Sequence, residues 1–170
     1  MSILAAVTRF NDKTYKENCD YRAKNGMLGC CYGTPVLLQE HTPIGSIVYV
    51  FEMNNETNKI MGIGMIRNHN RADKRYNIYS DGNYNRHNYR SEYRIDRVEL
   101  VEYDKRFVEM MEILVFKGYT HMKRGHGITL ITDKKYKELK QTKMDILSTI
   151  SDMFIHKYRK ANFNNATCNS

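Results

Sequence analysis

The first half of the chain carries its apolar residues in short runs or at alternate positions, which is the pattern of β-strands. Residues 3–7 form an apolar run that predicts a buried first strand. Residues 46–53 and 59–66 are rich in β-branched, aromatic and other apolar side chains and flank a polar turn, so they predict a β-hairpin. Gly62 and Gly64 within the second strand favour a β-bulge.

Helical signals occur on either side of this hairpin. Thr14 and Glu17 have the spacing of a capping box and Asn25-Gly26 supplies a stop, so a short helix is expected between them. A second helix is expected from Asp104 to a stop at Gly118. One face of that helix collects its apolar side chains, namely Phe107, Met110, Met111 and Leu114.

The C-terminal part of the chain predicts a short strand and then a long helix. The strand is expected at 128–131, and Thr132-Asp133 is expected to cap a helix that ends at residue 160 in a basic last turn. The helix carries an apolar stripe formed by Leu139, Ile146, Leu147, Ile150, Met153 and Phe154. The Asn-rich residues 161–170 are expected to form a flexible tail.

The segment between Arg67 and Arg97 is polar and rich in tyrosine. Asp81-Gly82 predicts a tight turn that joins two short strands. The second strand would alternate Tyr84, Arg86 and Asn88 on one face with Asn85, His87 and Tyr89 on the other. Because both faces are polar or amphipathic, this pair of strands is expected to border solvent or a ligand.

Taken together, these elements predict an α+β fold with a small curved or barrel-like mixed sheet, flanked by two or three helices and followed by a long C-terminal helix. Residues 1–131 would form the α+β domain, and the helix at 132–160 would pack on the same domain. The tail at 161–170 would be separate from that packing.

Composition narrows the class of partner. The chain has 170 residues, a formal net charge of +8 and a pI of about 9.3, which favours a polyanion such as nucleic acid. No apolar stretch approaches the roughly 20 residues of a membrane-spanning helix, so no membrane association is expected. An intracellular protein is expected. The cysteines, Cys19, Cys30, Cys31 and Cys168, lack metal-ligand spacing, and neither a metal nor another cofactor is expected.

Two segments could contact nucleic acid. In the basic, glycine-punctuated stretch 121–127, Lys123 and Arg124 could bind phosphates, although the stretch lacks the spacing of a nucleotide-binding phosphate loop. Arg67 and Arg71 are the other phosphate candidates. Candidates for stacking on bases or reading their edges are Tyr32, Tyr84, Asn85 and Tyr89. A basic loop without a ligand, and a sheet whose tyrosines cover the core, are the alternatives.

Histidines offer a weaker signal. A general base or metal ligand could come from His69, Asp73, His87, His121 and His126. No pair has helical metal-ligand spacing, and none is flanked by the second group that acid–base catalysis needs. No catalytic residue is assigned. The sequence does not decide whether the protein is an enzyme, and it favours a protein that is not.

Two resemblances carry further expectations. Residues 43–50 and 60–66, Pro-Ile-Gly-Ser-Ile-Val-Tyr-Val and Ile-Met-Gly-Ile-Gly-Met-Ile, resemble the hairpin of PUA-like domains, the group that includes EVE, ASCH and YTH modules. This resemblance implies a pseudobarrel that recognises nucleic acid, sometimes through a modified base in an aromatic cage. The chain has no Trp, so a cage would use Tyr32, Tyr84 or Tyr89.

The chain is also similar to a family of uncharacterised proteins of nucleocytoplasmic large DNA viruses. The similar segments are 31–35, 52–55, 83–86 and 123–128, which include Cys-Tyr-Gly-Thr-Pro and Lys-Arg-Gly-His-Gly-Ile. This similarity implies the cytoplasm of an infected host cell, or the virion, as the setting.

Three hypotheses about function follow. The first is a nucleic-acid-binding module, for RNA or DNA, that uses a basic, tyrosine-rich face. The second is a viral structural or assembly protein that forms a homo-oligomer or docks on a virion protein through the C-terminal helix. The third is a metal-dependent nuclease.

Overall fold

The computed structural model describes residues 2–38, 42–138 and 145–167, with side chains up to residue 159. In chain order its elements are β1 (Ile3–Phe10), α1 (Asp12–Lys24), β2 (Cys30–Thr34), β3 (Ile47–Asn54), β4 (Lys59–Arg67), the 3₁₀ helix η1 (Gly82–Asn85), β5 (His87–Ser91), β6 (Arg94–Asp96), α2 (Arg97–Phe116), β7 (Thr129–Leu130), α3 (Asp133–Lys137) and α4 (Ile146–Thr167). The fold is therefore α+β, as predicted.

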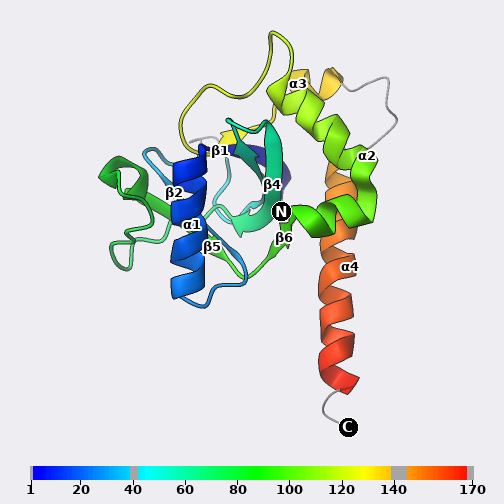
Figure 1. Ribbon diagram of the computed structural model, residues 1–170, viewed down its shortest axis with the longest axis horizontal. Coiled ribbons are helices and arrows are strands. Elements are labelled where there is room, and N and C mark those ends of the chain that lie inside the picture. The colour runs from blue at the N-terminus through cyan, green and yellow to red at the C-terminus, as the bar shows by residue number, and fades with distance from the viewer. Residues whose placement is uncertain (1, 39–41, 139–144, 168–170) are drawn as a thin grey trace.

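Within the described residues, the main sheet has five strands in the order β6-β4-β3-β1-β7 (Figure 1). Strands β1 and β3 are parallel, whereas the other neighbours are antiparallel. Strands β2 and β5 form a separate antiparallel ribbon. The sheet is mixed, as expected, and among the described residues it ends at β6 and β7, so it is not closed into a barrel.

The predicted β-hairpin is confirmed as β3 and β4. Its turn is stabilised by Asn54, whose side-chain oxygen accepts hydrogen bonds from the backbone N–H groups of Glu56 and Thr57 at 3.0 and 3.2 Å. Asn58 has a positive φ of 53°, which asparagine tolerates better than most residues. The register shifts between Phe51 and Met53, where Met61 and Gly62 of β4 face the single residue Glu52 of β3, so the bulge lies on β4 and includes Gly62, as predicted.

Side chains on alternate positions of β1 and β3 enter two different cores. Tyr49, Phe51 and Met53 face a core shared with α2 and α4, whereas Val48 and Val50 face a core shared with the β2–β5 ribbon. Figure 1 shows this layering, with α2 and α4 on one side of the sheet and α1 with the ribbon on the other. Because both faces of the sheet are buried, its central strands are largely apolar, and Glu52 and Asn54 on β3 are buried polar exceptions.

The helices begin and end at other residues than predicted. Asn11, rather than Thr14, caps α1, and it forms a capping box with Thr14. Helix α2 begins seven residues early at Arg97 and is kinked at Asp104, whose carboxylate accepts from the N–H of Phe107 at 3.0 Å and so starts a new helical segment. Asp104 is therefore an internal cap.

The predicted C-terminal helix is divided into α3 and α4. Its expected N-cap, Thr132, makes no side-chain capping bond. Helix α4 continues to Thr167, so residues 161–167 are helical where a tail was expected. The apolar stripe of α4 packs in the core, with Ile146, Ile150, Met153 and Phe154 buried, while Leu139 lies outside the described residues. Within the described part of the chain, no helix has the length and apolarity to cross a membrane.

Candidate nucleic-acid interface

The basic stretch 121–127, here called the glycine loop, is held in place by side chains from the sheet. Arg9 on β1 donates from Nε to the carbonyl of Met122 at 2.6 Å and from Nη1 to the hydroxyl of Thr129 at 3.0 Å. Asn55, beyond β3, donates to the carbonyl of Lys123 at 2.9 Å. Gly127 has φ 64°, and a side chain there would meet Thr34 at 3.3 Å. The loop thus has a defined path.

A cleft of about 430 Å³ opens beside this loop, and we call it the tyrosine cleft. It is lined by the end of β1, the first turns of α1, η1 and the glycine loop. Phe10 and Tyr79 contribute aromatic surface, and Tyr84 packs edge-to-face on Tyr79 with 6.4 Å between ring centroids. Tyr84 keeps 37% of its surface exposed. Lys13 and Lys123 add positive charge.

Two acceptor oxygens in the lining of this cleft are buried. Glu17 accepts from the N–H of Ser80 through Oε1 at 3.3 Å, while its Oε2 has no hydrogen-bond partner among the described residues. The Oδ1 atom of Asn55 likewise has no described partner. A buried acceptor without a donor is costly, and a ligand or water that donates to it recovers that cost.

A second depression, of about 590 Å³, lies on the other side of η1, and we call it the arginine hollow. Four exposed cationic side chains line it, namely Arg71, Lys74, Arg75 and Arg86. No Asp or Glu is among the described residues that line it. None of the four cations forms an ion pair with a described acidic residue.

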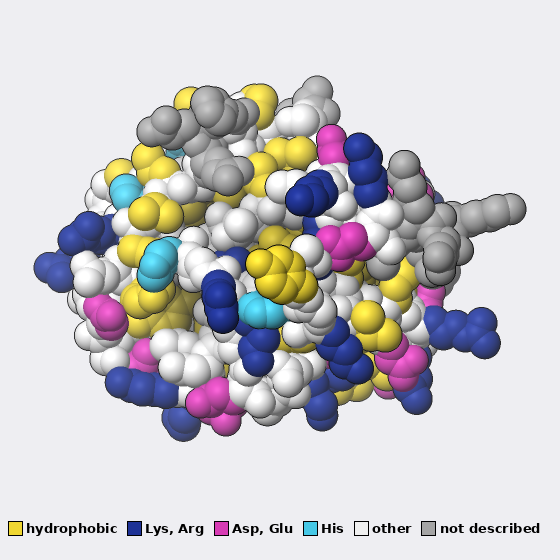
Figure 2. All heavy atoms as spheres, turned by 90° about the horizontal axis from the view of Figure 1, so that it is seen from above, with side chains coloured by type: hydrophobic (Ala, Val, Ile, Leu, Met, Phe, Trp, Pro, Cys, Tyr) yellow, Lys and Arg dark blue, Asp and Glu magenta, His cyan; other side chains and the backbone are white. Residues whose placement is uncertain are grey.

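The two depressions share η1 as their common wall. Asp81 and Tyr84 line the tyrosine cleft, whereas Gly82, Asn83 and Arg86 line the arginine hollow. Of the predicted contact residues, Tyr84 and Lys123 therefore line one cleft, and Arg71 and Asn85 line the neighbouring hollow. Figure 2 shows the surface from above, where Lys and Arg side chains are spread over the face among fewer Asp and Glu side chains.

Three predicted base-contacting residues lie in the interior instead. Tyr32 and Tyr89 are each 1% exposed. The hydroxyl of Tyr89 accepts from the N–H of Leu38 at 2.9 Å. Asn85 accepts from the N–H groups of Ile78 and Tyr79, both at 3.0 Å. Tyr32 and Tyr89 are engaged in packing and do not lie on an exposed face, whereas Asn85 is bonded to the backbone and borders the arginine hollow.

The region around Asp81-Gly82 explains the burial of Asn85. The predicted tight turn between two strands is the 3₁₀ helix η1, capped by the Asp81 carboxylate at 2.9 Å from the N–H of Asn83. The Asn85 side chain accepts from the N–H of Ile78 and donates to the carbonyl of Tyr79. These bonds satisfy backbone groups that a neighbouring β-strand would otherwise pair with. Only β5 of the two predicted strands is present in the described chain.

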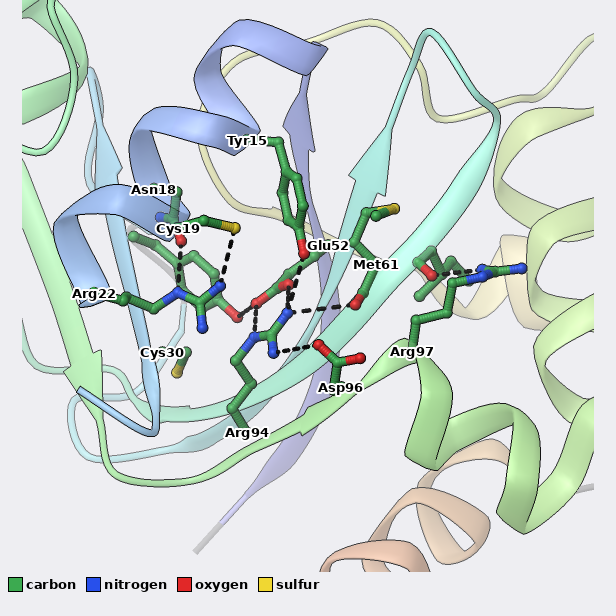
Figure 3. A network of polar contacts seen from close by, with 12 residues as sticks. Tyr15, Asn18, Cys19, Arg22, Cys30, Glu52, Met61, Arg94, Asp96 and Arg97 are labelled. Carbon is green, nitrogen blue, oxygen red and sulfur yellow. Dashed lines mark hydrogen bonds and ion pairs between the residues drawn. The ribbon is translucent and has the colours of Figure 1, made fainter. Parts of the chain in front are cut away.

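Tyr32 belongs to a buried ionic network that links β2, β3, β6 and α1 (Figure 3). Arg94 donates from Nε and Nη2 to the two carboxylate oxygens of Glu52 at 2.9 and 2.7 Å. Tyr32 donates to Glu52 at 2.8 Å. Burial alone would lower the pKa of Arg94, but the Glu52 carboxylate reverses this and raises it. Burial, reinforced by Cys30 and Glu52, raises the pKa of Tyr32.

The same network explains the glycines of β4. A Cβ on Gly64 would lie 2.1 Å from the Tyr32 hydroxyl, and one on Gly62 would lie 2.6 Å from Nη2 of Arg94. Gly62 lies in the bulge of β4, and both glycines also allow the close approach of Arg94 and Tyr32. Glu52, Arg94 and Tyr32 line neither the tyrosine cleft nor the arginine hollow, and we assign this network to stability.

The remaining candidates lie apart from the two depressions. Arg67 ends β4 and donates to the carbonyl of Gly45 at 3.4 Å, and Arg124 is exposed in the glycine loop. Neither residue lines the tyrosine cleft or the arginine hollow. Sequence reasoning had missed Lys13, Glu17 and Asn55, which lack a motif and come together only in the fold.

The histidines do not form a metal centre within the described residues, where no group of three or more His, Cys, Asp and Glu is placed to hold a metal ion. His121 accepts from the N–H of Lys123 through Nδ1 at 3.2 Å, which helps to shape the glycine loop. Cys19, Cys30 and Cys31 are free thiols.

In comparisons with known proteins, no family model matches the chain, and neither a curated protein nor a solved structure matches it. The assignment of function therefore depends on the chemistry of the two depressions.

Proposed function

We propose that this protein binds single-stranded or locally unpaired nucleic acid and holds one base in the tyrosine cleft. The convergence of Tyr84, Lys13 and Lys123 around one cleft carries the proposal. A half-exposed tyrosine ring offers a stacking surface to a base, and lysines beside it suit the adjacent phosphates. The cleft volume of about 430 Å³ falls in the range of small-ligand sites. A base paired in a duplex would not enter it.

The unpartnered oxygens of Glu17 and Asn55 suggest which bases are preferred. Both atoms are covered in the unbound protein, so a base reaches them only by displacing the side chains around them; as acceptors they then suit an exocyclic amino group, as adenine, cytosine and guanine carry. Thymine and uracil lack that donor. The carboxylate of Glu17 also repels phosphate, which favours phosphates at the lysine rim and a base deeper in the cleft.

Replacing the stacking ring tests the proposal directly. Tyr84→Ala should weaken binding of a short single-stranded oligonucleotide by about 1–3 kcal/mol, measured by fluorescence anisotropy, because stacking on the ring is lost. Tyr84→Phe should keep most of the affinity. Tyr119→Ala is the matched control, since Tyr119 is fully exposed and lines neither depression.

Equal losses in the Tyr84→Ala and Tyr119→Ala proteins would contradict a base in this cleft. The same assay with oligonucleotides that carry modified bases tests whether the cleft prefers a modified base to an unmodified one.

The other two hypotheses have less support. The apolar stripe proposed to dock on a partner is occupied within the molecule, because Ile146, Ile150, Met153 and Phe154 are buried. A metal-dependent nuclease would need metal ligands, and among the described residues no group of three or more His, Cys, Asp and Glu is placed to hold a metal ion. The PUA-like relationship, and the setting in an infected cell or virion, are proposed from the sequence resemblances alone.

A further inference from the structure

The arginine hollow is a cationic surface on an ordered frame. The frame is formed where residues 70–71 run beside β5, since Arg71 donates its N–H to the carbonyl of Asn88 at 2.7 Å and Asn88 donates its N–H to Asn70 Oδ1 at 2.8 Å. Asn85 and Asn88 are 7% and 2% exposed. The backbone that carries the four cations is thus fixed by buried amides.

The charge of this hollow is not balanced by its own lining. Asp73 and Asp81 are each adjacent in the sequence to a residue of the hollow. The Tyr76 hydroxyl donates to both oxygens of Asp73 at 2.7 and 2.9 Å, and Asp81 accepts from the N–H of Asn83 at 2.9 Å. The side chain of Lys74 lies over the Tyr76 ring, 5.3 Å from its centroid. Four like charges around one concave surface repel one another, so a bound polyanion relieves that repulsion.

We propose that the arginine hollow binds the backbone phosphates of the nucleotides next to the base in the tyrosine cleft. The ligand is then a strand that crosses η1, with a base on one side and phosphates on the other. This inference rests on the proposed function. It adds a second subsite that reads phosphate and not base.

The dimensions of η1 suit such a path. A 3₁₀ helix rises by about 2.0 Å per residue, so the four residues of η1 form a ridge of about 8 Å. Gly82 lines the hollow, and a Cβ placed there would have Nη2 of Arg75 as its nearest neighbour at 3.8 Å. The surface of η1 is therefore unobstructed at this residue. A strand of roughly 4 nucleotides, the short end of single-strand site sizes, would reach both subsites.

Abasic extension separates phosphate binding from base binding. A labelled single nucleotide is compared with the same nucleotide extended by abasic sugar-phosphate units on its 5′ or its 3′ side. We expect affinity to rise at least tenfold with extension on one side. No gain on either side would overturn the phosphate subsite.

Charge removal then locates that gain. In the Arg75→Gln/Arg86→Gln protein, the slope of log affinity against log salt for a single strand should fall by about 1.4, which corresponds to two phosphate contacts. The control is Lys105→Gln/Arg106→Gln, which removes two exposed cations of α2 outside both depressions. An equal change in slope for both proteins would overturn the proposal.

Failure of this inference is distinguishable from failure of the proposed function. Binding that depends on Tyr84 but shows neither the extension gain nor the Arg75/Arg86 salt effect overturns the phosphate subsite and leaves the base site standing. Binding of polyglutamate to the hollow as tightly as an abasic strand would also overturn it, because an acidic protein segment would then be the better ligand.

Discussion

Glu52 shows how the role of a residue depends on the strand face it occupies. It follows Val48 and Val50 on the face of β3 that packs against the β2–β5 ribbon, and it is 1% exposed. A lone carboxylate in that position would be neutralised or expelled. The bidentate contact with Arg94 makes the position tolerable.

Breaking this pair should strongly destabilise the fold. Glu52→Ala leaves the buried Arg94 guanidinium with only the half-exposed carboxylate of Asp96 as an ionic partner, and we expect a loss of about 3–5 kcal/mol in the free energy of unfolding, measured by urea denaturation. Replacing both residues by methionine should recover part of that loss. A double variant no more stable than Glu52→Ala would contradict this explanation.

An exposed ion pair supplies the control. Asp20→Ala removes the partner of Lys16 on α1, where both side chains are largely exposed. Its unfolding midpoint should stay close to that of the parent protein.

Residue types alone predicted which side chains could contact a nucleic acid, but not which of them are exposed. Tyr32, Tyr84 and Tyr89 are chemically equivalent candidates in the sequence, and only Tyr84 is on the surface. The difference arises because the ribbon lies flat against the sheet and buries Tyr32 and Tyr89. No local pattern reveals such a contact between distant elements.

The β2–β5 ribbon is the element that sequence reasoning described least well. Every residue of β2 is buried, so it lacks the alternation that identifies a half-exposed strand. No strand was therefore predicted at residues 30–34. The β3–β4 hairpin was predicted correctly because both of its strands are rich in β-branched residues and a clear turn joins them.

The buried thiols of β2 predict a loss of stability at high pH. Burial raises the pKa of both Cys30 and Cys31 to about 12, against 9.0 for a free thiol. As pH rises, the unfolded chain therefore loses these thiol protons before the folded protein does. The stability that the neutral thiols contribute is fully present below the pKa of the unfolded chain and is lost as pH rises through the pKa of the folded protein.

Urea midpoints measured from about pH 8 to about pH 10.5 should therefore fall as pH rises. In the Cys30→Ala/Cys31→Ala protein this fall should be shallower, whatever its midpoint at neutral pH. Identical slopes in the two proteins would contradict burial of neutral thiols in β2.

At the scale of the whole molecule, the layered arrangement separates stability from recognition. The apolar faces of the sheet are covered by α2 and α4 on one side and by the ribbon and α1 on the other. The net charge of +8 was evident from the sequence, but its concentration around η1 was not, because Lys13, the 71–75 segment, Arg86 and Lys123 meet only in the folded chain.

The most direct measurement compares one labelled oligonucleotide as a single strand and as a duplex, titrated with the 170-residue chain and with its Tyr84→Ala variant. Insertion of an unpaired base predicts tighter binding of the single strand, with that preference lost in the variant. Equal or tighter binding of the duplex, unchanged by Tyr84→Ala, would contradict it.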